Sequence, residues 1–504
     1  MAKLEFGVER GLRWSTLRQT IVAIASVVSL VVLARLLTPA DFGAAALAMV
    51  VLGGLRSLTD LGVQAAVIHY REDEDDYASV ALWMNLALSL VAAVIVLALA
   101  GALGRFYDSP LAAGLTRVAV VSFIIESFAV APLALIVKGL QFTLHETIQG
   151  VKSLIIMLGP LVMAVMGFGA WSLVVPYVIG AAVLCVLAWL VADFRPVWRL
   201  DRAVLRNVVR FAWNMYGGNV LDYLIHNLDD AIIGRALGTA QLGLYNFAKK
   251  RSLFVALNVS GLTSRVALPT LARDQGNPEE LEKTYLDMLR LSAALTTPAQ
   301  VGLIVVAEQV VPLVFGQQWV PATAVFRLFF IYSLVRSLSL ISTAVTAAIG
   351  RPDVPFRLNL VQLPLLVFAI WLGLKGGLIG VTVGVVAVTT GAHLVYVYLS
   401  TRLLDVSWRA MWQYLGSIVT ASGVMGLIAL LAKLMLTRRW SVGWPSLIGA
   451  ALIGGVVYIA VWLLLDRHAF VDTGVTFLQV LVPRKIRRSG AARGGPAGGP
   501  TVTP

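Results

Sequence analysis

Apolar and polar positions follow each other along the chain in long blocks. Runs of roughly 20 apolar residues recur between residues 17 and 465, separated by short polar segments, and a run of that length crosses the hydrocarbon core of a bilayer. The pattern therefore predicts about fourteen spanning helices. They lie near residues 17–37, 42–69, 79–103, 114–137, 147–168, 170–192, 209–234, 241–271, 286–308, 322–349, 354–374, 377–400, 413–435 and 445–465.

Composition supports this interpretation. Of the 504 residues, 59% are hydrophobic and 13% are charged, whereas a soluble domain carries roughly 25% charged residues. The connections are short and leave no extramembrane domain. The fold class predicted is an all-α polytopic membrane protein. Residues 466–504 turn basic and then Gly/Pro-rich, which predicts a disordered tail.

The basic residues predict the orientation, because Lys and Arg gather in cytoplasmic segments. Lys3, Arg10 and Arg13 precede the first span, a cluster from Arg195 to Arg206 separates spans six and seven, and another follows Arg484. All three lie on one side, so both termini are predicted to be cytoplasmic. The net charge of +13 is then a topology signal, and we expect no nucleic-acid partner.

Two similar short segments occur, one in each half of the predicted bundle. LLTPADFG at 36–43 and ALGTAQLG at 236–243 each end an apolar run, and 31–48 share five identities with 231–248. Thr38, Pro39 and Asp41 suit the N-cap, N1 and N3 positions of a helix. Each copy therefore reads as the tight hairpin between two spans, with a helix cap as its only role.

The spacing of the two copies predicts the topology. Six spans separate them, an even number, so both halves enter the membrane in the same direction as a parallel repeat. Chance similarity between two turns is the alternative. The repeat predicts two six-helix lobes around a central cavity, as in an alternating-access transporter. The predicted parts are a cytoplasmic segment 1–16, an N-lobe 17–192, a basic linker 193–208, a C-lobe 209–401, two extra helices at 413–465 and the tail.

Charged residues inside the predicted spans are candidates for the cavity wall, because such groups are costly in lipid. The candidate cations for an anionic ligand are Arg18, Arg56, Lys249, Lys250, Arg251 and Arg336. The candidates for ion coupling or for ion pairs within the cavity are Asp60, Glu126, Asp222, His226, Asp229 and Asp230.

Structural roles compete with each of these assignments. Lys249 or Lys250 can pair with Asp229 and Asp230, since both pairs lie at similar distance from the second hairpin. Three consecutive helical residues cannot all face one partner, so at least one cation of the triplet is expected to face the cavity. Arg56 can pair with Asp60 within its helix, and Arg18 can be a topology anchor. Asp222 and His226 can relay protons or form a satisfied polar face.

Motifs for enzymatic chemistry are largely missing. The chain lacks a G-x-x-x-x-G-K-[ST] loop, and no HExxH, CxxC or G-x-S-x-G motif stands out. We therefore expect a transporter with no catalytic residue, metal or cofactor, in which direct ATP drive would need another subunit.

Four segments carry a resemblance to a known family. LARLLTPADFG followed by SLTDLGVQAAVIHY, NLDDAIIGRALGTAQLGLYNFAKK, GQQWVPA and AAIGRPDVPFRL are similar to signatures of Wzx-type oligosaccharide flippases, in the same order. The branch they resemble serves exopolysaccharides such as colanic acid, succinoglycan and xanthan. The resemblance covers roughly residues 10–430.

The resemblance implies the fold of the multidrug/oligosaccharidyl-lipid/polysaccharide exporters, with a cationic cavity between two lobes. It implies a substrate, an undecaprenyl-diphosphate-linked oligosaccharide, moved to the periplasmic leaflet of a bacterial inner membrane for exopolysaccharide or O-antigen assembly. It also implies that an H⁺ or Na⁺ gradient drives this transport. Polymerase and chain-length proteins of the same pathway are expected partners. Two alternatives stay open: an ion-coupled drug or metabolite exporter of the same superfamily, and a membrane polysaccharide polymerase or ligase.

Overall fold

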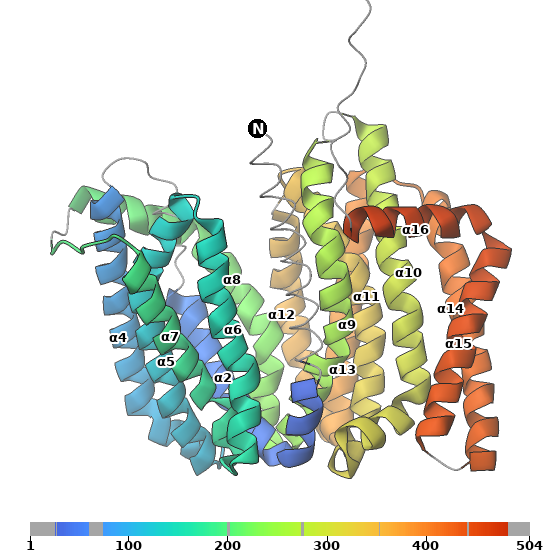
Figure 1. Cartoon of the computed structure of the whole chain (residues 1–504), viewed down its shortest axis with the longest axis horizontal. Helices are drawn as coiled ribbons and strands as arrows, with labels where there is room; N and C mark the ends of the chain where they lie inside the picture. The colour runs from blue at the N-terminus through green and yellow to red at the C-terminus, as the bar shows by residue number, and fades with distance from the viewer. Residues whose placement is uncertain are drawn as a thin grey trace, which may run out of the picture.

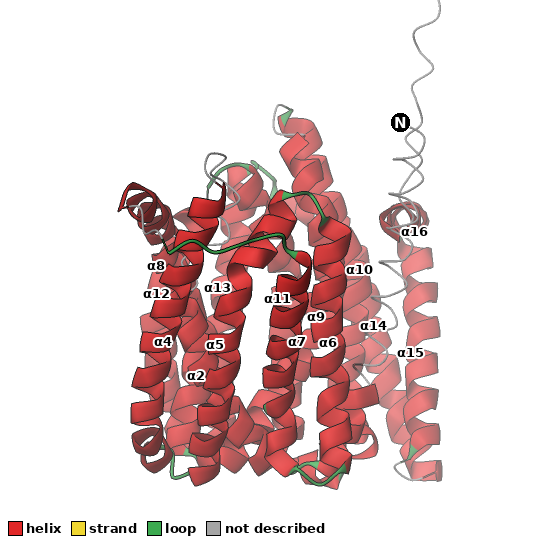
Figure 2. Cartoon of the chain, turned by 60° about the vertical axis from the view of Figure 1, so that its left-hand side comes forward, coloured by secondary structure: helices red, strands yellow, loops and turns green. Residues whose placement is uncertain are grey.

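The structure is a computed structural model that describes residue 26 and residues 28–59, 74–198, 202–273, 277–351, 353–440 and 443–481. Helices make up the secondary structure of these residues, and no strand occurs among them (Figure 2). Ten helical segments of the described part are long and apolar enough to cross a membrane. The protein is therefore an all-α, multi-pass membrane protein, as the sequence predicted.

The number of spans stays a prediction. The apolar segment Asp353–Leu403 contains two helices, and the helices Arg202–Ala236 and Gly238–Arg273 are not among the ten. Most of the first predicted span lies outside the described residues.

The helices form two bundles (Figure 1). The N-terminal bundle contains α2 (Pro39–Thr59), α4 (Glu74–Phe106), α5 (Pro110–Lys138), α6 (Phe142–Val165) and α7 (Val175–Val191). The C-terminal bundle contains α9 (Gly238–Arg273), α10 (Pro278–Val310), α11 (Thr323–Ala348), α12 (Asp353–Gly373) and α13 (Gly377–Leu403), flanked by α14 (Trp408–Trp440) and α15 (Trp444–Leu465). Helix α8 (Arg202–Ala236) packs against α2 and α4 as well as against α9 and α12.

The chain after the last span differs from the prediction. We expected a disordered tail from residue 466, but Arg467–Leu481 form helix α16, which lies across the ends of the spanning helices (Figure 1). The Asp466 carboxylate accepts a hydrogen bond from the backbone N–H of Ala469 at 2.8 Å, and Phe470 packs on Trp462. A side-chain cap and an aromatic contact thus hold the start of this helix. Residues 482–504 lie outside the described part.

The first hairpin has the cap that the sequence predicted. The Thr38 hydroxyl accepts a hydrogen bond from the Asp41 N–H at 3.2 Å, and the Asp41 carboxylate accepts one from the Thr38 N–H at 2.9 Å. This reciprocal pair is a capping box. It stabilises the start of α2 and fixes the direction in which the helix leaves the turn.

The two hairpins also contact each other, which the sequence interpretation missed. A Cβ added to Gly43 would overlap the carbonyl of Thr239, and a Cβ added to Gly243 would overlap the carbonyl of Pro39. Residues 39 and 239, like 43 and 243, are equivalent positions of the repeat. The first turns of α2 and α9 therefore cross about a two-fold axis at backbone contact distance. The view of the repeat as a helix cap alone is wrong.

Hydrogen bonds between the bundles close the same region. The indole N–H of Trp319 donates to the carbonyl of Ala34 at 2.8 Å, and Gln318 donates to the carbonyls of Ala34 and Leu37. In return Arg35 donates to the carbonyl of Leu313 at 2.6 Å. Carbonyls at the end of a helix have no partner within it, and lipid offers none. Each bundle thus satisfies the helix ends of the other.

Aromatic side chains fill the space beneath these bonds. Phe42 of α2 meets the rings of Phe247 and Trp319 edge to face, with centroids 5.2 and 5.3 Å away, and Phe247 stacks on Trp319 at 3.8 Å. One hydrophobic core continues from the N-terminal into the C-terminal bundle here. The bundles converge on this hairpin side, at the bottom of Figure 1, and diverge toward the opposite side.

The close contact of α2 and α9 at Gly243 predicts that one added methyl group lowers the stability of the protein. Gly243→Ala should lower the free energy of unfolding by about 1–3 kcal/mol, because the backbone of α2 must move to make room. Gly391→Ala is the matched control: a Cβ there meets nothing within 4 Å, so stability should stay equal or rise slightly. Thermal unfolding of the purified variants measures both, and equal melting temperatures would contradict the crossing.

Candidate functional site

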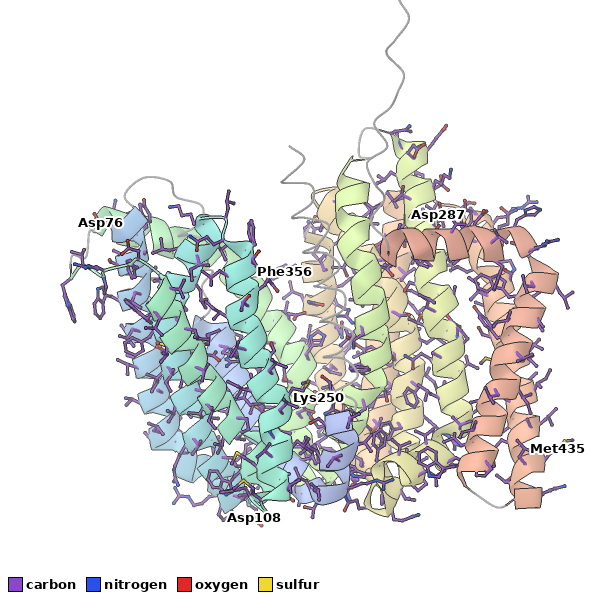
Figure 3. The ribbon with its side chains drawn as sticks, in the orientation of Figure 1. Asp76, Asp108, Lys250, Asp287, Phe356 and Met435 are labelled. Carbon is purple, nitrogen blue, oxygen red and sulfur yellow. The ribbon has the colours of Figure 1, made fainter. Side chains whose placement is uncertain are left out.

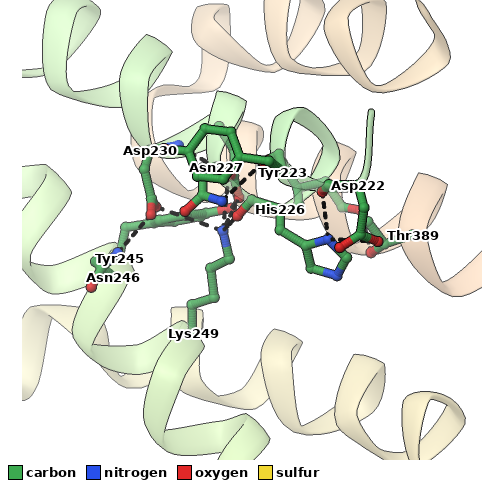
Figure 4. Close-up of polar contacts among 11 residues, drawn as sticks. Asp222, Tyr223, His226, Asn227, Asp230, Tyr245, Asn246, Lys249 and Thr389 are labelled. Atoms are coloured by element: carbon green, nitrogen blue, oxygen red, sulfur yellow. Dashed lines mark hydrogen bonds and ion pairs between the residues drawn. The ribbon is translucent and has the colours of Figure 1, made fainter. Parts of the chain in front are cut away.

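Lys249 lies at the centre of a polar cluster between α8 and α9 (Figure 4). Its Nζ is 2.7 Å from Oδ2 of Asp229 and 3.7 Å from Oδ1 of Asp230, and it donates to the carbonyl of His226 at 2.8 Å. Both carboxylates are almost fully buried, at 1% and 2% exposure. The ammonium therefore neutralises part of a buried negative charge between α8 and α9.

Neighbouring side chains of α9 complete this cluster. The Tyr245 hydroxyl donates to Asp229 at 2.5 Å, and the Asn246 amide donates to Asp230 at 2.7 Å. Tyr245, Asn246 and Lys249 reach α8 together because residues three and four apart share a helix face. Lys249 is thus occupied by an ion pair, the structural role that the sequence analysis had set against ligand binding.

A second ion cluster lies in the N-terminal bundle. Glu126 of α5 accepts from Arg56 of α2 at 2.7 Å and from Lys152 of α6 at 2.7 Å. Two cations share one carboxylate, so the cluster keeps a net positive charge. Sequence analysis missed Lys152. A charged residue inside the span predicted at 147–168 was the signal that could have identified it.

The other two cations of the α9 triplet have a different environment. Lys250 is exposed and lies between the two bundles (Figure 3). Arg251 is partly buried, with its guanidinium 5.5 Å from the ring centroid of Phe247. Neither has an ion pair with a carboxylate among the described residues. Arg251 interacts electrostatically with Tyr177 of α7, so it faces the opposite bundle.

Arg336 of α11 has a histidine as its partner. Its Nη1 lies 3.0 Å from Nε2 of His393 in α13. On α8, His226 Nδ1 lies 3.6 Å from Oδ1 of Asp222, and both side chains are partly exposed. Sequence analysis missed His393 because nothing in the spacing of α13 distinguishes it from a core histidine.

The remaining candidates do not join these clusters. Arg18 and Asp60 lie outside the described residues, so their assignments stay predictions. A further cation inside a predicted span, Arg327 of α11, pairs with Glu308 at 2.9 Å, and Glu308 also binds Lys433 of α14 at 2.8 Å. This pair of bonds ties α14 to the C-terminal bundle and leaves Arg327 no free role.

Cations outnumber carboxylates in the described clusters. The cations are Arg56, Lys152, Lys249, Lys250, Arg251 and Arg336; the carboxylates are Glu126, Asp222, Asp229 and Asp230. The excess belongs to Lys250, Arg251 and Arg336 of the C-terminal bundle and to the Arg56–Lys152 pair. A group with several negative oxygens is the natural complement of such an arrangement.

A separate cavity of about 370 Å³ lies between α10, α14 and α15. Small and apolar side chains line it, among them Ala429, Ala450 and Gly454. Its described lining contains no charged side chain, so an anionic group has no partner there. The candidate site for an anion is therefore the region between the two bundles.

The fold is similar to that of solved polytopic helical membrane proteins. It resembles the structure of the lipid II flippase MurJ in an inward closed conformation, with a TM-score of 0.75 over 90% of this chain and 99% of that one, at 13% identity. It also resembles an inward-facing multidrug resistance transporter of the MATE family and MOP superfamily, with a TM-score of 0.61 over 77% of this chain and 94% of that one, at 16% identity.

The chain belongs to the polysaccharide biosynthesis protein family, whose model matches residues 32–324. It is 26% identical over 377 residues to the lipopolysaccharide biosynthesis protein WzxC of Escherichia coli K12, covering 74% of this chain and 77% of WzxC. It is 25% identical over 323 residues to the succinoglycan biosynthesis transport protein ExoT of Rhizobium meliloti, covering 64% and 65%. The resemblance seen in the sequence motifs is confirmed.

The two kinds of cation predict different consequences for stability. Lys249→Met should lower the free energy of unfolding by about 3–5 kcal/mol, because it strands two buried carboxylates. Lys250→Met should change it by less than about 0.5 kcal/mol, as expected of an exposed residue. Adding Asp229→Asn and Asp230→Asn to Lys249→Met should recover part of the loss. Equal melting temperatures for the two single variants would contradict the assigned roles.

Proposed function

We propose that the protein moves polyprenyl-diphosphate-linked oligosaccharide repeat units from the cytoplasmic to the periplasmic leaflet of a bacterial inner membrane. The observation that carries this proposal is a set of cations that form no ion pair with a described carboxylate: Lys250 and Arg251, which face the space between the bundles, and Arg336 of the C-terminal bundle. A diphosphate crossing the low-dielectric core needs such partners. Family membership and the names of the relatives support a polysaccharide pathway.

The arrangement of the bundles supports alternating access. With the termini in the cytoplasm, as the positive residues favour, the hairpin side is periplasmic. The bundles then join at the periplasmic side and diverge toward the cytoplasm (Figure 1), the conformation that accepts a headgroup from the cytoplasmic leaflet. The reverse conformation requires the hairpin-side contacts of Phe42, Trp319 and Gln318 to separate while contacts form at the other end.

The lipid divides between two environments in this scheme. The polyprenyl tail stays in the bilayer, and the diphosphate and sugars pass between the bundles. Undecaprenyl diphosphate is the carrier that we propose, for exopolysaccharide or O-antigen assembly with a polymerase and chain-length proteins of the same pathway. An H⁺ or Na⁺ gradient is the proposed energy source, since each charge contributes about 2.3 kcal/mol per 100 mV. The reaction is transport, without a catalytic residue.

Substituting the unpaired cations tests the proposal. In a strain that lacks its own copy of the gene, Lys250→Gln with Arg251→Gln should abolish polymer export, because the diphosphate loses two charged partners. Lipid-linked repeat units should accumulate on the cytoplasmic leaflet. The measurement is surface polymer together with the extracted lipid-linked repeat units.

Lys375→Gln is the matched control, since Lys375 is exposed and lies over the ring of Trp371, away from the clusters. It should leave export unchanged. Normal export by the Lys250/Arg251 double variant, at the membrane level of the wild type, would reject the role of these cations.

A further inference from the structure

Arg336 and His393 form a contact whose chemistry depends on a single proton. The guanidinium of Arg336 only donates hydrogen bonds and stays charged. Its Nη1 lies 3.0 Å from Nε2 of His393, so Nε2 must accept with its lone pair. The backbone carbonyl of Thr389, one turn earlier in α13, is the partner of the imidazole's other nitrogen. The imidazole in this structure is therefore neutral, with its proton on Nδ1.

A second proton on His393 is incompatible with this arrangement. It would occupy the lone pair that Arg336 uses and would place two positive groups side by side in a partly buried site. An anion that binds Arg336 removes both obstacles, because the guanidinium turns its donors to the anion and the anion offsets the repulsion. A protonated His393 can then donate its Nε2–H to the same anion.

We propose that His393 is a proton-binding site linked to the lipid headgroup, so that the protein takes up a proton at His393 when a diphosphate binds Arg336. This inference rests on the proposed function, because the anion is the diphosphate of the transported lipid. It adds a residue that neither the sequence motifs nor the family match assigns. By reciprocity, a proton on His393 tightens diphosphate binding by the same factor as the diphosphate tightens proton binding.

The charged and titratable groups around His393 leave this linkage in place. From α11, the Tyr332 ring lies 5.5 Å from the imidazole, next to Arg336. From α8, His226 interacts electrostatically with His393 and pairs with Asp222. Lys249 of α9 and Asp229 of α8 interact with Tyr332 and pair with each other. Among the described residues, Arg336 is thus the cation that directly contacts His393.

His226 does not fit the same role. Its nearest charged partner is the Asp222 carboxylate, 3.6 Å away, and its Nδ1 lies 2.8 Å from the backbone carbonyl of the same residue. These described partners of His226 are acceptors and not a guanidinium, so an anion at Arg336 releases no lone pair on His226. Of the two histidines, His393 is the one whose proton affinity depends on an anion at Arg336.

The linkage fixes the sign of a pH effect. Where free His393 is neutral and the bound form is protonated, the apparent affinity for a diphosphate should rise as the pH falls, by at most about tenfold per pH unit for one linked proton. The headgroup's own titration adds to this slope. The wild type must therefore be compared with a variant at position 393 that cannot take up a proton.

Calorimetry measures the linked proton directly. Purified full-length protein is titrated with farnesyl diphosphate near neutral pH, in buffers of different ionisation enthalpy, and the dependence of the heat on the buffer gives the protons taken up per ligand. His393→Gln keeps an acceptor for Arg336 but cannot be protonated, and His393→Asn is a second variant of the same kind. His145→Gln in α6 is the matched control. Melting temperatures establish that each variant is folded.

The wild type and His145→Gln should take up more protons per bound ligand than His393→Gln, by up to one proton. Their affinity for farnesyl diphosphate should also rise more steeply as the pH falls. Equal proton uptake by the wild type and both position-393 variants would overturn the inference while leaving diphosphate binding intact. Loss of the uptake in His226→Gln, with His393→Gln unchanged, would also overturn it. Absence of farnesyl diphosphate binding at any pH would instead reject the proposed function on which the inference rests.

Discussion

Close contact between the first turns of α2 and α9 is the constraint on which the rest of the structure depends. Glycine at 43 and 243 lets two backbones meet where any side chain would collide with a carbonyl. Lipid provides no hydrogen-bond donors, so Trp319 and Gln318 satisfy the helix end at Ala34 and Leu37, and Arg35 does the same at Leu313. The bundles are joined at this end and diverge at the other (Figure 1), and Lys250 lies between them while Arg251 faces the opposite bundle.

Charge in the interior is divided between structure and function. Lys249 is committed to Asp229 and Asp230, and Arg56 and Lys152 share Glu126. These pairs fix neighbouring helices to one another, and breaking one of them would leave an uncompensated buried charge. Lys250, Arg251 and Arg336 have no such carboxylate among the described residues, and so they keep the capacity to bind an anion. The three cations are consecutive in α9, and of these described residues only Lys249 pairs with the carboxylates of α8. The position of α8 beside α9 therefore decides which cation is used for structure.

The sequence predicts what depends on local order and misses what depends on packing. Span length, the cap at Thr38 and the repeated hairpin are local patterns, and the structure confirms the helical class and the cap. The partner of Arg56 lies 70 residues away and that of Arg336 lies 57 residues away, and no spacing rule links them. The glycine contact required knowing that the two copies of the repeat touch. Helix α16 was missed because a basic, Gly/Pro-rich composition further along dominated the interpretation of the tail.

The central claim is that the protein recognises the charged diphosphate of a lipid and carries it across the membrane. The most direct test is a translocation assay in proteoliposomes, in which a fluorescent sugar is attached to a polyprenyl chain and a membrane-impermeant reagent quenches the label in the outer leaflet. The account predicts that the purified protein translocates the lipid with a diphosphate linkage and fails to translocate the same lipid with a neutral linkage. Equal translocation of both lipids would contradict it.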